Sequence, residues 1–179
     1  MREKEVKAMD EVLKAVKERR SIRNFRNTPI PADIVAKLSE ALIWAPSAGN
    51  LQSRRFYFVT DENLRKQIAI AALNQEFIAE APLVIVGCAD DRISQKYGER
   101  GMYLYAIQDV ACSIMNMMLV AEENGIGTVW VGAFLEYNIH QILKLPLNLK
   151  PVVVCPVGYP AVIPAPPERV SLSEAIEKR

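Results

Sequence analysis

The 179-residue sequence predicts one layered domain of the α/β or α+β class, covering residues 1–179. Segments with helical spacing of apolar residues alternate with short continuous apolar runs of strand length. The chain shows no internal repeat and no low-complexity segment, and its length suits a single buried core. Half of its residues are hydrophobic and 24% are charged, as in an ordinary globular protein.

Three helices and one strand are expected in the first half of the chain. Apolar residues three or four positions apart predict the helices, and prolines limit them, because proline disfavours helix in the residue before it. Pro46 ends the second helix. The expected elements are a helix through Val6, Met9, Leu13 and Val16 to about Arg19, an extended stretch at Thr28–Pro31, a helix with Ile34 to Ala45 on its inner face, a strand at Phe56–Thr60 and a helix at Asn63–Ala72.

The rest of the chain is expected to contain three strands, two helices, of which the first is long, and a proline-rich arm. The long helix is apolar nearly all round, so it is central or lies at a subunit interface, and Gly125 is its natural C-cap. Four prolines keep the arm from forming a helix or a central strand. In order, we expect a strand at Leu83–Cys88, a polar loop at Asp90–Gly101, the long helix at Met102–Asn124, a strand at Thr128–Val131, a helix near Asn138–Lys144, a strand at Val152–Cys155 and the arm at Tyr159–Pro167.

Charge and composition narrow the possible functions. The net charge of +1 points to neither a nucleic-acid nor an anionic-membrane partner. A charged start, with no apolar stretch near the ~20 residues that cross a bilayer, predicts a cytoplasmic protein that uses no membrane. We expect Cys88, Cys112 and Cys155 to be free and buried. A single histidine provides too few ligands for a typical zinc site and argues against a Ser-His-Asp triad, so no metal is expected. Any catalysis is therefore expected to depend on a bound organic cofactor.

A dense basic segment, Arg19-Arg20-Ser21-Ile22-Arg23-Asn24-Phe25, follows the first expected helix. Three guanidinium groups and a hydroxyl within five residues suit a phosphate, which arginine binds in bidentate fashion. The alternative is a solvated basic helix end that interacts favourably with the helix dipole. The apolar residues that alternate with the arginines favour a built site.

Three further segments are candidates for binding a flat heterocycle. The turn Pro46-Ser47-Ala48-Gly49-Asn50-Leu51-Gln52 offers amides that donate and accept together, although an ordinary turn would look similar. The strand from Gly125 to Phe134 is bracketed by glycines, so its backbone can approach a ligand closely, and it lacks the spacing of a dinucleotide fingerprint. Arg169 is a lone arginine carried by the proline arm.

Taken in this order, the segments resemble the nitroreductase family of FMN-dependent oxidoreductases, from Arg19 to Arg169. The basic opening and the Pro46–Gln52 turn are the most specific parts, supported by the glycine-bracketed strand and by Pro156–Pro160. The resemblance implies an α+β fold: a three-layer α/β/α sandwich with a mixed, mostly antiparallel sheet flanked by helices. It also implies a homodimer with shared flavin sites and an extended C-terminal arm.

The resemblance also implies a set of cofactor-binding residues. Arg19, Ser21 and Arg23 would hold the FMN phosphate and ribityl chain, with Arg20 contributing through its backbone. The turn would reach the flavin of the other subunit through Pro46, Ser47 and Asn50, and Gln52 presents a second amide there. Val131 and Gly132 would pack on the isoalloxazine, where Gly132 is expected to leave no room for a side chain and to offer its N–H near the reactive nitrogen. Arg169 would close on the phosphate.

The implied activity is a ping-pong oxidoreductase reaction in which NAD(P)H reduces FMN, and a nitroaromatic, quinone or similar small acceptor then takes the electrons. The alternatives are dehalogenation or flavin oxidation on the same fold, or a non-catalytic flavin carrier. The chain also departs from the family. Ser53-Arg54 stands where many relatives have Pro-Trp, and Phe77 stands where longer relatives have a lysine near the flavin carbonyls. Arg54 and Asn74 are the candidates for stabilising reduced flavin, and the short Cys88–Met102 segment suggests an open substrate pocket.

Overall fold

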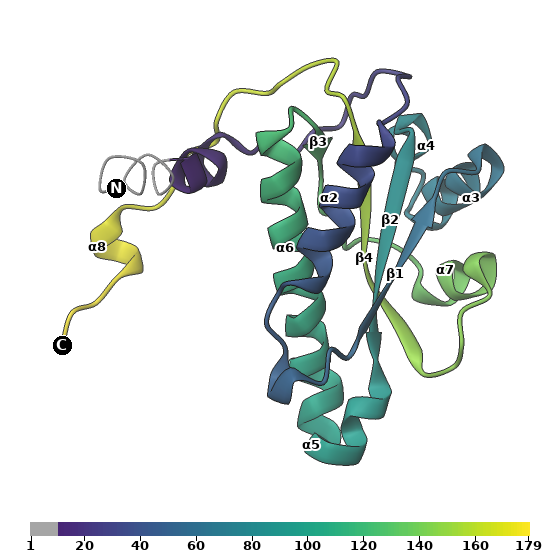
Figure 1. Ribbon diagram of the computed structural model, residues 1–179, viewed down its shortest axis with the longest axis vertical. Coiled ribbons are helices and arrows are strands. Elements are labelled where there is room, and N and C mark those ends of the chain that lie inside the picture. The colour runs from purple at the N-terminus through teal and green to yellow at the C-terminus, as the bar shows by residue number, and fades with distance from the viewer. Residues whose placement is uncertain (1–10) are drawn as a thin grey trace.

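The computed structural model describes residues 11–179, so the start of the first expected helix, with Val6 and Met9, lies outside the described residues. A four-stranded sheet forms the middle layer, in the order β1-β2-β4-β3, and every pair of neighbouring strands is antiparallel (Figure 1). Among the described residues, the single parallel pairing is an isolated bridge between Ser21 and Thr128. The α+β class and the mostly antiparallel sheet are therefore confirmed. The strands are β1 (Arg54–Val59), β2 (Leu83–Asp90), β3 (Gly127–Thr128) and β4 (Leu149–Gly158).

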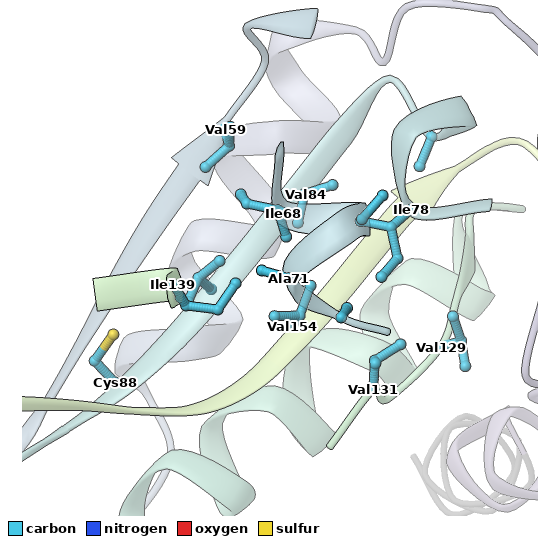
Figure 2. Close-up of a cluster of buried hydrophobic side chains, with 14 of the residues drawn as sticks. Val59, Ile68, Ala71, Ile78, Val84, Cys88, Val129, Val131, Ile139 and Val154 are labelled. Carbon is cyan, nitrogen blue, oxygen red and sulfur yellow. The ribbon is translucent and has the colours of Figure 1, made fainter. Parts of the chain in front are cut away.

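Helices cover both faces of the sheet and bury a separate apolar cluster on each. Helices α2 (Ala32–Ile43) and α6 (Ala106–Glu123) cover one face, where Leu38, Ile114 and Val153 are fully buried. Helices α3 (Glu62–Ala71), α4 (Phe77–Glu80) and α7 (Glu136–Leu143) cover the other face, over the cluster shown in Figure 2. Strand β2 is buried along its whole length, as its continuous apolar run predicts. These clusters hold the three layers together.

The segment expected as a polar loop at Asp90–Gly101 is helical, so that prediction is wrong. A short 3₁₀ turn (Asp91–Ile93) leads into α5 (Ser94–Arg100), and a π-helical turn (Gly101–Tyr105) then runs into α6. The Asp90 side chain accepts a hydrogen bond from the Arg92 N–H and caps the start of this run. Two buried residues, Ile93 and Gly101, anchor a segment whose composition is mostly polar.

Several other predictions need smaller corrections. The strand expected at Thr128–Val131 is reduced to β3, and Val131 pairs with Val154 only as an isolated bridge. Cys88 and Cys155 are buried, and burial raises the pKa of each thiol to about 12. Cys112, in contrast, is exposed on α6.

The helical run Asp91–Glu123 is long and apolar enough to cross a membrane, which the sequence analysis did not expect. In this fold, 44% of its most apolar window is buried inside the protein. A core helix of a soluble domain has the same features, and α6 packs between the sheet and α2 in this way.

The cap at Asp90 gives a prediction about acid stability. The hydrogen bond from Arg92, reinforced by the Asn148 amide at 3.0 Å, lowers the pKa of Asp90 to about 2. Because this folded-state pKa lies below the unfolded value of about 3.9, the stabilisation is present above about pH 4 and is lost as the pH falls through about 2. We expect Asp90→Asn to remove about 1–2 kcal/mol of unfolding free energy at neutral pH and much less near pH 2. Urea unfolding of wild type, Asp90→Asn and the matched control Asp91→Asn measures this, and a constant difference across that range would contradict it.

Candidate functional site

The basic segment lies directly against the glycine-bracketed strand. The backbone N–H of Ile22 donates to the Thr128 carbonyl at 3.0 Å, and Ser21 forms the parallel bridge with Thr128. A Cβ on Gly127 would lie 2.6 Å from the Ile22 side chain, so this approach requires glycine. The first and third motifs, which are about a hundred residues apart in the sequence, therefore form one surface.

The arginines of this segment have different surroundings. The Arg20 guanidinium donates to the carbonyls of Lys17, Glu18 and Arg19 at 2.6, 2.9 and 3.0 Å, so it is used at the end of the first helix. The Arg23 side chain is exposed, and its guanidinium carbon lies 6.0 Å from the centroid of the Phe77 ring. Arg19 and Ser21 are half-buried beside it. The Arg23 guanidinium therefore makes no hydrogen bond among the described residues, whereas that of Arg20 is used, so Arg20 could contribute to a site only through its backbone.

A glutamine that sequence reasoning missed fixes the backbone after Gly132. The Gln75 amide donates to the Ala133 carbonyl at 3.2 Å and to the Ala72 carbonyl at 2.8 Å, which ties the loop after α3 to this segment. Gly132 is exposed, and a Cβ there would meet only the Trp130 side chain, at an ordinary 3.6 Å. Within the chain itself there is room for a side chain, so only an external ligand would require glycine at this position.

The two candidates for stabilising reduced flavin lie in different places. Asn74 is exposed, has a left-handed backbone (φ 59°) and belongs to the same loop as Gln75. The Arg54 guanidinium instead donates to the carbonyls at the end of α2. Burial lowers the pKa of Arg54, and the nearby Asp109 partly opposes this shift. Asn74 is therefore next in sequence to the residue that binds the Ala133 carbonyl, whereas Arg54 is used at the end of α2.

Hydrogen bonds from the Ser47 and Arg54 side chains hold the Pro46–Gln52 turn in one conformation. Its backbone is left-handed at three positions, namely Gly49, Asn50 and Gln52. The Ser47 hydroxyl accepts from the Gln52 N–H at 3.0 Å, and Arg54 donates to the Pro46 carbonyl at 2.9 Å. The side chains of Asn50 and Gln52 are exposed and make no hydrogen bond among the described residues. The turn thus presents two free amides.

Asp109 is a second residue that sequence reasoning missed. It is buried in α6, and its Oδ1 accepts the Ala48 N–H at 2.9 Å. Its Oδ2 is also buried and has no hydrogen-bond partner among the described residues. A lone carboxylate between Ile107 and Val110 of an apolar helix was the sequence signal that could have identified it.

The turn and the basic segment lie at opposite ends of α6 within one chain. Asp109, which holds the turn, and Glu123, at the end of α6 next to β3, are separated by roughly 20 Å at the helical rise of ~1.5 Å per residue. Figure 1 shows α5, which packs on the turn, at one end of α6 and β3 at the other. The turn also lies on the α2–α6 face of the sheet, whereas Phe77 packs on the opposite face.

Arg169 lies near neither the basic segment nor the Pro46–Gln52 turn. The arm starts beside the basic segment, where the Ala161 N–H donates to the Asn24 carbonyl at 2.9 Å. From residue 161 to 179, however, every residue is exposed, and the arm extends away from the sheet (Figure 1). Among residues 11–179, the Arg169 guanidinium donates only to backbone carbonyls of its own arm, with Glu168 at 3.0 Å. A single chain therefore separates the predicted site residues into three places.

The model of the nitroreductase family matches residues 16–75 and 67–159. A protein of Methanothermobacter thermautotrophicus, named a candidate NADH dehydrogenase/NAD(P)H nitroreductase, is 29% identical over 178 residues and covers 94% of this chain and 90% of its own. A protein of the same description from Archaeoglobus fulgidus is 33% identical over 156 residues (85% and 87%). FMN reductase [NAD(P)H] of Bacillus subtilis is 27% identical over 168 residues (86% and 67%).

Solved structures show the same fold. B. megaterium NfrA2 superposes with a TM-score of 0.87 at 24% identity, over 94% of this chain and 74% of that one. The NADPH:FMN oxidoreductase of Vibrio harveyi, solved with NAD⁺, gives a TM-score of 0.86 at 24% identity, over 94% and 76%. These similarities confirm the expected three-layer α/β/α architecture.

Proposed function

The chain belongs to the nitroreductase family, and from this premise we propose that it is an FMN-dependent NAD(P)H oxidoreductase. The observation that carries the proposal is the contact of the Arg19–Arg23 segment with the strand that leads to Gly132, which puts anion-binding groups beside open backbone. The relatives named FMN reductase [NAD(P)H] and NAD(P)H nitroreductase support the choice of cofactor and electron donor. We propose a cytoplasmic location, since the free cysteines Cys88, Cys112 and Cys155 suit a reducing compartment.

The residues of this surface suit FMN. Arg19, Ser21 and Arg23 supply charged and neutral donors for a phosphate, and Arg23 stands over Phe77 with its guanidinium exposed. Val131 and Gly132 would lie against the flat ring, because Gly132 has no neighbour of its own chain that needs the space. Gln75 holds the Ala133 carbonyl and so orients the Gly132–Ala133 peptide. Bound FMN would supply the chemistry of hydride acceptance and electron transfer, and the protein would supply position and electrostatics.

The overall reaction with a nitroarene is NAD(P)H + H⁺ + ArNO₂ → NAD(P)⁺ + ArNO + H₂O. We propose ping-pong kinetics, since donor and acceptor would occupy the same exposed face beside Gly132 in turn. Quinones and similar small acceptors are equally compatible with this face. A non-catalytic carrier would bind FMN with the same residues and would show no turnover.

We propose that the working unit is a homodimer with each flavin site built from both chains. The turn and the basic segment lie at opposite ends of α6, so a two-fold pairing along α6 would place the turn of one chain at the basic segment of the other. Exposed apolar side chains lie along the surface that such a pairing would cover. They line a hollow of about 500 Å³ between the first helix, α2 and α6, and include Val12 and Trp44 (75% exposed), with the half-buried Leu119 beside them. The exposed arm, with Val162, Ile163 and Leu172, would lie on the partner.

The proposed activity predicts a yellow protein that consumes NAD(P)H. We expect the purified protein to carry FMN and to oxidise NAD(P)H when a quinone or nitroarene is added, as followed by nicotinamide absorbance.

We expect Gly132→Val to stay folded, because its own chain leaves space there, but to lose most of its FMN. Circular dichroism and FMN content measure the two effects. A yellow wild type without turnover would favour the carrier, and a fully yellow, active Gly132→Val protein would place the flavin elsewhere.

A further inference from the structure

The helix α5 packs directly on the turn that we propose reaches the partner's flavin. Gly49 of the turn has a left-handed backbone (φ 55°), and a Cβ there would lie 2.3 Å from the Tyr97 hydroxyl and 3.4 Å from the Lys96 ammonium. These two polar groups are therefore the nearest neighbours of Gly49, next to the exposed Asn50. If the turn lies beside the partner's flavin, α5 therefore lies beside that flavin as well.

The surface of α5 combines cations with tyrosine rings. The Lys96 ammonium lies 5.4 Å from the centroid of the Tyr97 ring, and the Arg100 guanidinium lies 5.5 Å from that of Tyr105. The two rings pack edge to face, with centroids 5.5 Å apart, and Arg100 Nε donates to the Tyr105 hydroxyl at 3.0 Å. We call these four residues the α5 cluster. They offer flat aromatic surface and positive charge in one place.

The two cations of the α5 cluster form no ion pair in the part of the chain that the structure describes. Among the described residues, neither Lys96 nor Arg100 forms an ion pair with a carboxylate, whereas the neighbouring Arg92 pairs with Asp90. Glu99, also on α5, is exposed and makes no such pair. Lys96 is likewise exposed, so its ammonium is available to an anion from outside.

The backbone around the α5 cluster is irregular but closely packed. A π-helical turn (Gly101–Tyr105) follows α5, and such turns are frequent at functional sites. A Cβ on Gly101 would lie 2.8 Å from the Tyr97 Cβ, so the start of that turn packs against Tyr97. Tyr97 is thus fixed between Gly101 on one side and Gly49 on the other.

We propose that the α5 cluster is the acceptor subsite, and that it selects aromatic acceptors that carry a carboxylate or another anionic group. This proposal rests on the proposed function, because the turn brings the cluster to the partner's flavin only in the shared site. The acceptor ring would pack on the solvent-accessible part of the half-buried tyrosine rings, and its anion would be bound by Lys96, with Arg100 lying beyond the non-helical Gly98. The redox balance is that of the nitroarene reaction given above, with NAD(P)H as the reductant.

The test compares two acceptors of nearly the same shape that differ in charge, para-nitrobenzoate and para-nitrobenzamide. At saturating NAD(P)H we expect wild type to have the higher kcat/KM for the benzoate, and Lys96→Gln to lower the benzoate-to-benzamide ratio by about five-fold. The ratio cancels changes that affect both acceptors alike. Lys66→Gln, which removes a cation of α3 that pairs with Glu62, is the matched control and should keep the wild-type ratio. Raising the ionic strength should lower the wild-type ratio, because the ammonium is exposed.

The outcomes separate this proposal from the proposed function. A wild-type ratio near one, or an equal ratio in wild type and Lys96→Gln, would overturn the acceptor subsite while turnover continued. If neither these compounds nor a quinone is reduced, the proposed function fails, and binding then decides the subsite. Titrating each compound into the FMN-loaded protein and following the flavin spectrum gives a Kd without turnover. Weaker benzoate binding by Lys96→Gln than by wild type would support the subsite, and equal binding would overturn it.

Discussion

Replacing Arg23 with alanine is expected to weaken FMN binding at least about tenfold. Charge-assisted hydrogen bonds to a phosphate contribute about 1.5–3 kcal/mol each, and 1.4 kcal/mol corresponds to a factor of ten in Kd. Arg23 is exposed, its guanidinium lies over the Phe77 ring, and it makes no described hydrogen bond that would use its donors within the chain. Fluorescence titration of the apoprotein with FMN measures the change. Arg19→Ala should act in the same direction, because Arg19 lies in the same segment.

Two neighbouring arginines provide controls for Arg23→Ala. Arg26 is exposed just after this segment, and only its backbone is engaged: its N–H donates to the Tyr159 carbonyl at 2.9 Å, and its carbonyl accepts from the Thr28 N–H at 2.8 Å. Arg26→Ala should therefore bind FMN like wild type. Arg20→Ala should lower the stability of the first helix, because its guanidinium bonds three carbonyls there, with less effect on FMN. If FMN affinity stays unchanged in both Arg19→Ala and Arg23→Ala, the phosphate is bound elsewhere.

Mixing two variants that are each poor in flavin is expected to restore flavin binding. An Arg23→Ala chain lacks part of the phosphate grip, and an Asn50→Ala chain lacks the free amide of the turn that reaches the partner. If each site combines the basic segment of one chain with the turn of the other, a heterodimer of the two variants contains one intact site and one doubly defective site. Random pairing gives about half heterodimers, so about a quarter of the wild-type FMN content should return. Co-refolding the two chains and measuring bound FMN tests this.

The control for the mixing experiment is the double variant with Arg23→Ala and Asn50→Ala in one chain, mixed with wild type. The same number of mutations then leaves one defective residue in each site of the heterodimer, so no site in it is intact. The FMN bound by this mixture should therefore come only from its wild-type homodimers. A monomeric 20.1 kDa protein that binds FMN tightly would contradict the shared site, and so would a mixture of the two single variants that stays colourless.

The sequence by itself determined the main features of the fold and the family. Apolar runs identified β2 and β4, helical spacing identified α2, α3 and α6, and Gly125 marked the end of α6 with its left-handed backbone. These features depend on neighbours within a few residues, which the sequence shows directly. The basic segment and the Pro46–Gln52 turn were recognised for the same reason, since each is a continuous stretch of donors and small residues.

Tertiary structure alone decided what each side chain of those segments can do. Arg20 and Arg54 look like phosphate or flavin ligands in the sequence, but backbone carbonyls left unpaired at helix ends lie within reach and use their donors. Asp109 and Gln75 hold the turn and the Gly132 segment across 61 and 58 residues, respectively, separations that no local pattern reveals. The distance between the basic segment and the turn was set by the packing of α6 along the sheet, and it is this distance that points to a site made from two chains.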